Sequence, residues 1–297
     1  MNISQRGYAL PTILIISMII IVITMSIISS GREKIAVALE LKDKGRAYLL
    51  SYSAMNEVIY NILTSVFTPT GLRIYKEDGS QLDWNLYGDT IEMDKFVTVK
   101  LRDGAGMYSP LFNMLNLGKL VEYVSKFSDK SSLFSDSLGD WQDKDDFRRL
   151  NGAEYIDYKN EDYGYGPRNH YIQLPEEIML LKGFNRELFH DIKDEIFYWG
   201  TNTINYLTMS RKSLKAQLRD DSLVDGILEL RKSGHLTRSV FMDMTNLYYT
   251  EEALFSPSGW IKVEVEARSK NASDRIEAVI LKREMDESPY LISEWRR

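Results

Sequence analysis

The sequence predicts an α+β protein. A long N-terminal helix, partly membrane-spanning, packs on an antiparallel sheet, and a large all-α domain is inserted between strands of that sheet. Three observations carry this prediction: an uncharged apolar run that continues as an amphipathic helix, two regions of alternating polar and apolar residues, and a long stretch of helical pattern between them. Strands on both sides of a helical block favour one sheet domain interrupted by an insertion.

The composition sets limits on function. The chain has 297 residues, of which 44% are hydrophobic, so it can build a substantial core. It carries 37 Lys and Arg against 43 Asp and Glu, and the resulting net charge of −6 disfavours tight binding of nucleic acid. Because there is no cysteine, a disulfide framework, a thiolate metal site and a cysteine nucleophile are all excluded.

The apolar run extends from Tyr8 to Gly31 without a charged residue. As a helix it is roughly 36 Å long, which exceeds the hydrocarbon core of about 30 Å, so residues 8–31 are predicted to span a membrane. A cleaved secretory signal has a shorter apolar centre, but the small residues 29–31 keep that alternative open. Arg6 precedes the run and Arg32 follows it, so charge does not decide the orientation.

The N-terminal helix is expected to begin near Leu10 and to continue beyond the membrane to about Leu63. Pro11 is tolerated in a first helical turn, where its missing amide has no intrahelical partner. An apolar stripe with alternating spacings of three and four is formed by Ala38, Leu41, Gly45, Tyr48, Tyr52, Met55, Ile59 and Ile62. We expect the second half of this stripe to pack on the chain's own domain and the first half on neighbouring subunits.

The remaining chain divides by its periodicity. Residues 32–106 hold the rest of the helix and the first strands, including the alternating segment from Val97 to Leu101. Residues 107–236 are predicted to form the inserted helical domain. Residues 237–297 are predicted to return to strands, with alternation from Ile261 to Val265 and a turn at "NASD", residues 271–274.

The start of the chain resembles a prepilin-type leader. In "QRGYALPTILIISMI" a short polar head, residues 1–7, ends at Gly7 and an apolar helix follows. The resemblance implies that prepilin peptidase cuts between Gly7 and Tyr8 and that Tyr8 becomes a methylated first residue. Type IV pilins and pseudopilins share this leader, so it indicates only the superfamily.

Other motifs resemble the K subunit of the type II secretion system. They are, in order, "GDWQDKDDFRRLNGAEYIDY", "YGYGPRNHYIQLPEEIMLLKGFN", "TNTINYLTMSRKSLKAQL" and "IEAVILKRE…YLISEWRR", the third being a loose version of an Asn-rich helix opening. This resemblance implies a minor pseudopilin that initiates or caps a pseudopilus at its tip. Its partners would be the I and J minor pseudopilins, the major pseudopilin and prepilin peptidase. It would cross the bacterial inner membrane once, with its C-terminal domain in the periplasm.

Thr12 is the fifth residue after the expected cleavage site. Most pilins have Glu there, which is understood to neutralise the amino terminus of a neighbour in the fibre. An unpaired carboxylate in lipid is costly, so Glu is useful mainly where a partner charge arrives. The K subunit likewise lacks this Glu, so the resemblance assigns Thr12 an assembly role at the tip.

Several aspartates crowd together, among them Asp140, Asp143 and Asp145. Oxygen ligands at this spacing can bind Ca²⁺, and some K-subunit relatives bind calcium. The segment lacks the EF-hand register, and acids also stabilise helix N-termini, so capping and solvated charge are favoured over a metal site. No cofactor is required by the sequence.

Two alternative functions stay open at this point. The segment around Gly183 resembles half of a helix-hairpin-helix, which would suit a membrane-anchored DNA-binding protein, although acids outnumber bases around the turn. A minor pilin of a type IV pilus shares the leader but does not need the large insertion. The sequence has no H-E-x-x-H, G-x-S-x-G or phosphate-loop motif, so it does not predict an enzyme.

Overall fold

The structure is a computed structural model that describes residues 9–127, 129–199, 202–248, 253, 255–283 and 288–297. Its helices are α1 (Ala9–Thr64), α2 (Met114–Ser125), α3 (Lys130–Gln142), α4 (Tyr155–Asn160), α5 (Arg186–Ile192), α6 (Arg211–Leu218), α7 (Asp221–Lys232) and α8 (Arg238–Thr245). The 3₁₀ turns are η1 (Gly104–Gly106), η2 (Pro175–Leu180), η3 (Lys193–Glu195) and η4 (Tyr206–Thr208).

The strands form two antiparallel sheets. The smaller sheet has the order β1 (Val66–Thr68), β2 (Gly71–Tyr75), β3 (Gln81–Asn85). The larger sheet has the order β4 (Ile91–Glu92), β5 (Val97–Asp103), β6 (Trp260–Ser269), β7 (Ala272–Lys282), β8 (Tyr290–Arg296). Because β5 pairs directly with β6, the larger sheet is continuous across the insertion, as the sequence predicts.

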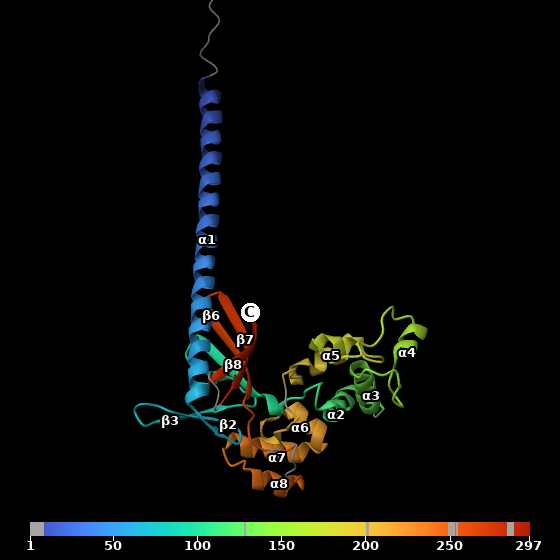
Figure 1. The fold of residues 1–297 in the computed structure, drawn as a ribbon. Coiled ribbons are helices and arrows are strands. Elements are labelled where there is room, and N and C mark those ends of the chain that lie inside the picture. Colours follow the sequence, from blue (N-terminus) through green and yellow to red (C-terminus); the bar gives the residue numbers. More distant parts are fainter. Residues whose placement is uncertain (1–8, 128, 200–201, 249–252, 254, 284–287) are drawn as a thin grey trace, which may run out of the picture.

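The C-terminal half of α1 packs on the larger sheet (Figure 1). Met55, Ile59 and Ile62, which end the predicted stripe, are buried against alternating residues of β5 and β6 such as Val99 and Val263. Burying each such side chain contributes roughly 1.5–3 kcal/mol. The predicted packing of this half of the helix on its own domain is therefore confirmed.

The first half of α1 is exposed, as Ile13 at 61% and Ile35 at 63% illustrate. Among the described residues, α1 is the one helix long and apolar enough to cross a membrane, with a mean hydropathy of 2.7 in its most apolar window and none of that window buried. The hydroxyls of Ser17 and Thr24 donate to the carbonyls four residues earlier, as isolated hydroxyls in an apolar helix should.

The inserted domain lies beside the end of α1 that is far from the N-terminus, and it has its own core (Figure 1). Large buried side chains of this core come from each of the helices α2 to α8 and include Leu120, Trp141, Tyr158, Ile192 and Phe241. A third, small cluster of Met107, Phe197 and Val279 joins the insert to the sheet.

The insert ends later than the sequence indicates. Residues 237–259 were expected to be strands, but α8 lies here and Phe241 and Phe255 are buried in the helical core. The boundary therefore falls close to Trp260, where β6 begins, and not at residue 236. The predicted turn is also earlier than "NASD": Lys270 has a left-handed φ of 50°, and Ala272 already pairs with Ser269.

Candidate functional site

The predicted processing site, Gly7 and Tyr8, lies outside the described residues. Thr12 lies on the first turns of α1, within the apolar span, with its side chain on the exposed surface of the helix. With threonine at this position, the described part of the span, residues 9–31, contains no charged side chain. The assembly role of Thr12 stays a prediction.

The aspartate-rich segment of residues 140–146, which we call the acidic loop, is organised by Arg149, a residue to which the sequence analysis gave no role. Arg149 Nη1 donates to Asp140 Oδ1 at 2.7 Å and also pairs with Asp143, while Arg149 N donates to Asp140 Oδ2 at 3.2 Å. Asp140 is fully buried at the C-terminal end of α3, so its charge needs this partner. The Asp145 carboxylate instead accepts a hydrogen bond from Phe147 N at 2.9 Å.

The three predicted calcium ligands are thus not gathered at one point. Asp140 and Asp143 meet at Arg149, and within the described part of the chain no group of three His, Cys, Asp or Glu side chains is placed to hold a metal ion. The expectation that these acids stabilise a helix N-terminus is wrong for Asp140 and Asp143, because Asp140 lies in the last turn of α3 and Asp143 is its C-terminal cap residue. In the structure, Asp140 and Asp143 both form ion pairs with Arg149.

Glu154 is the residue at this site that sequence reasoning missed. It is 4% exposed, and neither of its carboxylate oxygens has a hydrogen-bond partner. Burial, followed by repulsion from Asp140 and Asp143, raises the pKa of Glu154 to about 7. Gly152 brings this segment against α3, since a Cβ at residue 152 would lie 1.9 Å from Asp140 Oδ2.

Two more buried acceptors near Glu154 lack partners. They are Asp143 Oδ1 and Asn169 Oδ1. Asn169 is held beside α3 by a hydrogen bond from its backbone N to the carbonyl of Trp141 at 3.0 Å, and it lines the same cavity as Glu154. Buried oxygen acceptors without donors favour a cationic ligand or a proton.

Replacing Glu154 with Gln should therefore change stability in a pH-dependent way. The folded-state pKa of about 7 lies above the unfolded value of 4.5, so the wild-type loses stability as pH rises between these values. In chelator-containing buffer we expect E154Q to unfold at nearly the wild-type temperature at pH 4.5, and to be more stable by on the order of 1–3 kcal/mol at pH 8. Thermal unfolding at both pH values measures this, with the exposed Glu229→Gln as control; equal effects of E154Q at the two pH values would contradict it.

An aromatic cluster forms around Trp141, the residue that follows Asp140 in α3. Trp141 packs edge-on against Tyr158, and Tyr163 and Tyr165 complete the cluster. Trp141 Nε1 donates to Glu177 Oε2 at 3.4 Å, and Arg168 Nε pairs with the same carboxylate at 2.6 Å. The "YGYGP" segment, residues 163–167, is thus an aromatic packing loop, and Tyr165 links it to η2 by donating a hydrogen bond to the carbonyl of Leu180 at 3.2 Å.

The segment resembling a helix-hairpin-helix is packed against α3. Gly183 has φ 75°, a conformation that suits glycine, and a Cβ there would lie 2.9 Å from Leu133 Cδ2. Its carbonyl accepts a hydrogen bond from Lys130 Nζ at 3.2 Å. This contact favours the interpretation of the turn as a packing unit over a phosphate site.

Polar groups tie the insert to the sheet where the chain leaves and re-enters it. Asp103, at the end of β5, accepts hydrogen bonds from Ser258 N at 2.9 Å and Ser258 Oγ at 2.7 Å, just before β6. It also accepts from Thr208 Oγ1 at 2.8 Å, Asn205 Nδ2 at 3.1 Å and Ala105 N at 3.1 Å. One buried carboxylate therefore joins both crossing points and η4.

Two arginines reinforce the same junction. Arg102 Nη2 pairs with Glu195 Oε2 at 2.7 Å; burial alone would raise the pKa of Glu195, but Arg102 and the Ser213 hydroxyl together lower it. Arg231 of α7 is 5% exposed, lies over the Tyr87 ring at 4.8 Å, and donates to the carbonyl of Met209 at 2.8 Å. The Arg102–Glu195 pair and the contact of Arg231 with Tyr87 cross from the insert to the sheet domain.

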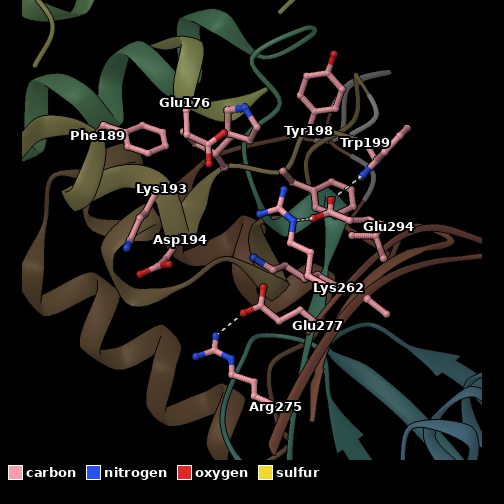
Figure 2. A pocket seen from close by; sticks show the side chains of 16 residues that line it. Glu176, Phe189, Lys193, Asp194, Tyr198, Trp199, Lys262, Arg275, Glu277 and Glu294 are labelled. Carbon is pink, nitrogen blue, oxygen red and sulfur yellow. Dashed lines mark hydrogen bonds and ion pairs between the residues drawn. The ribbon is translucent and has the colours of Figure 1, made fainter. Parts of the chain in front are cut away.

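A cavity of about 320 Å³ lies between the insert and the face of the sheet opposite α1 (Figure 2). Phe197 and Val279 form part of its buried lining. Trp199 Nε1 donates to Glu294 Oε2 at 3.1 Å, and Arg275 pairs with Glu277 at 2.6 Å across the sheet face. Because charges of both signs line the cavity and several pair with each other, the cavity shows no preference for one class of ligand.

Comparison with known proteins connects this fold to a family. Residues 108–196, which hold the acidic loop and the aromatic cluster, match the family model described as Type II secretion system (T2SS), protein K. No match was found among curated protein sequences.

A solved structure shares the fold of nearly the whole chain. It is a chain in the crystal structure of the GspK–GspI–GspJ complex from the enterotoxigenic Escherichia coli type 2 secretion system. The likeness has a TM-score of 0.51 at 14% identity and covers 90% of this chain and 98% of that chain. At this identity the likeness concerns the fold alone. Residues 108–196 therefore resemble protein K of type II secretion systems, and nearly the whole chain has the fold of a chain in the GspK–GspI–GspJ complex.

Proposed function

We propose that this chain is a minor pseudopilin of a type II secretion system that occupies the tip of the pseudopilus, where it initiates or caps assembly for protein export across the outer membrane. The observation that carries the proposal is the position of the insert beside the membrane-distal end of α1 (Figure 1). In a fibre built from parallel α1 helices, the next subunit would have to pass this bulk. A terminal subunit meets no such obstacle.

The same proposal predicts the cellular location of the chain and its partners. With α1 in the inner membrane, the residues beyond about Arg32 lie in the periplasm. The partners are I- and J-type minor pseudopilins, the class of subunit named in the structurally similar complex, together with the major pseudopilin. The work of the chain is assembly and not catalysis, and it involves no nucleic acid.

The test is co-purification. The full chain, coexpressed with the I- and J-type pseudopilins of its own system and extracted in detergent, should purify with one copy of each. Parallel coexpression with the minor pilins of a type IV pilus should give no complex. Isolation of this chain alone, beside an I–J pair, would contradict the proposal.

Thr12→Glu tests the terminal position. A carboxylate at residue 12 is useful only if the amino terminus of a neighbouring subunit neutralises it, and otherwise it is costly in the membrane. We therefore expect incorporation of the T12E chain into fibres to be unchanged or lower than wild-type, with Thr12→Val as the neutral control. Quantitative immunoblotting of sheared fibres measures this, and greater incorporation of T12E would argue against a terminal position.

We also propose that the acidic loop binds calcium. The unpartnered oxygens of Glu154, Asp143 and Asn169 fit the oxygen donors that Ca²⁺ takes, and these three residues would hold it. Arg149 pairs with both Asp140 and Asp143 but offsets only one of their two negative charges, so the cation would balance the remaining charge together with that of Glu154. Calcium would thereby fasten the loop after α3 to the start of α4.

Calcium should therefore stabilise the chain. At a concentration 100 times the dissociation constant, the expected gain is about 2.7 kcal/mol in the free energy of unfolding. E154Q should lose most of this gain at pH 8, although it is the more stable protein without calcium. Thermal unfolding with CaCl₂, and with MgCl₂ as control, gives the comparison; an equal calcium response of wild-type and E154Q would refute this site.

A further inference from the structure

A second cavity, of about 470 Å³, lies between the last turns of α1 and the β2–β3 hairpin. Strand β3 of this hairpin extends away from the insert (Figure 1). We call this cavity the hairpin groove. One wall is the face of α1 that carries Glu57, Tyr60, Asn61 and Thr64, whose spacing of three and four places them on one side of the helix. The other wall is formed by β2, β3 and β4.

The hairpin groove has an apolar floor and aromatic edges. Trp84 and Ile74, at 4% and 7% exposure, lie at the floor, whereas Tyr60 and Tyr75 are 65% and 58% exposed. Leu82 adds an apolar side chain that is 38% exposed. Exposed aromatic side chains beside an apolar floor are typical of protein-binding surfaces, because they bury a large area at low entropic cost.

The edge of the hairpin groove is acidic. Glu57, Glu77 and Glu92 line it, are exposed, and have no ion-pair partner among the described residues. Asp83 is already paired with Arg73 at 2.8 Å, and one lysine, Lys76, is among the lining residues. Three uncompensated carboxylates around an apolar floor complement a segment that carries Lys or Arg next to apolar residues.

The groove continues an exposed face of α1. Leu49, which is 67% exposed, precedes Tyr60 by 11 residues, so the two side chains lie about 20° apart around the helix and roughly 16 Å apart along it. A partner that packs along this face of α1 therefore reaches the hairpin groove. This favours a neighbouring fibre subunit, which runs beside α1, over a secreted substrate.

We propose that the hairpin groove is the docking site for a basic, apolar segment of a neighbouring minor pseudopilin. The inference rests on the proposed function, because it assigns the I- or J-type partner to this surface. Apolar side chains of the segment cover Trp84 and Ile74, and its cations pair with Glu57, Glu77 and Glu92.

Photocross-linking in the assembled complex tests the proposal. p-Benzoylphenylalanine replaces Tyr60 or Tyr75 in the full chain, coexpressed with its I- and J-type partners, and replaces the exposed Tyr171 of the insert as a control. A second pair of chains carries Glu77→Lys with Glu92→Lys, or Glu229→Lys with Asp243→Lys, which changes the net charge equally at exposed residues of α7 and α8. Mass spectrometry identifies the cross-linked peptide, and co-purification reports the complex independently.

The expected result is a cross-link from residues 60 and 75 to one minor pseudopilin, at a peptide that contains Lys or Arg. Its yield should fall about tenfold in the E77K/E92K chain and stay near the starting value in the E229K/D243K chain. If the complex co-purifies but residues 60 and 75 cross-link no more than residue 171, or cross-link only to a secreted protein, the groove assignment is overturned and the proposed function stands. If no complex co-purifies, both fail.

Discussion

Asp103→Ala should lower the free energy of unfolding by about 3–5 kcal/mol, because it removes a buried carboxylate that accepts five hydrogen bonds. The alanine removes the acceptor of Ser258 N and Asn205 Nδ2, and the hydroxyls of Thr208 and Ser258 keep only their contacts with backbone carbonyls at 3.2 Å. Since these donors lie at both crossing points of the insert, hydrogen exchange should rise first in η4 and at the start of β6.

The control for Asp103 is Asp78→Ala. Asp78 is exposed in the β2–β3 turn, where it accepts from Ser80 N at 2.9 Å, so its removal should cost less than about 1 kcal/mol. Chemical denaturation of the two variants gives the comparison. A loss for D103A as small as that for D78A would mean that Asp103 does not hold the junction.

Gly7→Val is expected to abolish both processing and secretion. The resemblance to prepilin leaders places the cut after Gly7, and a branched side chain at that residue should block the peptidase. The wild-type chain, coexpressed with prepilin peptidase, should have a mass that corresponds to methylated Tyr8 at its start, whereas G7V should keep Met1 or Asn2. Because the uncut chain keeps its polar head before the span, it should stay in the membrane and not enter fibres.

Ser29→Val provides the control for Gly7→Val. It alters the small-residue stretch that a signal peptidase would need but leaves the predicted leader intact, so it should be processed normally. A wild-type chain that begins near residue 32 would show that the apolar run is a cleaved signal, and an unprocessed wild-type chain would contradict the prepilin assignment.

The long helix and the central strands could be predicted because their periodicity extends over many residues. The stripe that ends at Met55, Ile59 and Ile62 and the alternation of Val97, Val99 and Leu101 both correspond to burial in the structure. The end of the insert could not be predicted in this way. Helix α8 has only eight residues, which is too short for a helical pattern to exclude a strand.

The acidic loop shows the same limit at a functional site. The crowding of Asp140 and Asp143 was visible in the sequence, but their ion pairs with Arg149 depend on the loop turning back onto α3. The unpartnered state of Glu154 depends on burial by surrounding elements, which no local pattern encodes. The hairpin groove likewise arises only because β2 and β3 fold beside the end of α1.

The central claim is that this chain occupies the tip of the pseudopilus, and end-labelling of fibres tests it most directly. Fibres assembled with the full chain, carrying a small epitope at its C-terminus, are labelled with gold-conjugated antibody and imaged by electron microscopy. We predict gold at one end of each fibre and none along its length. Gold distributed along the fibres would contradict a tip position.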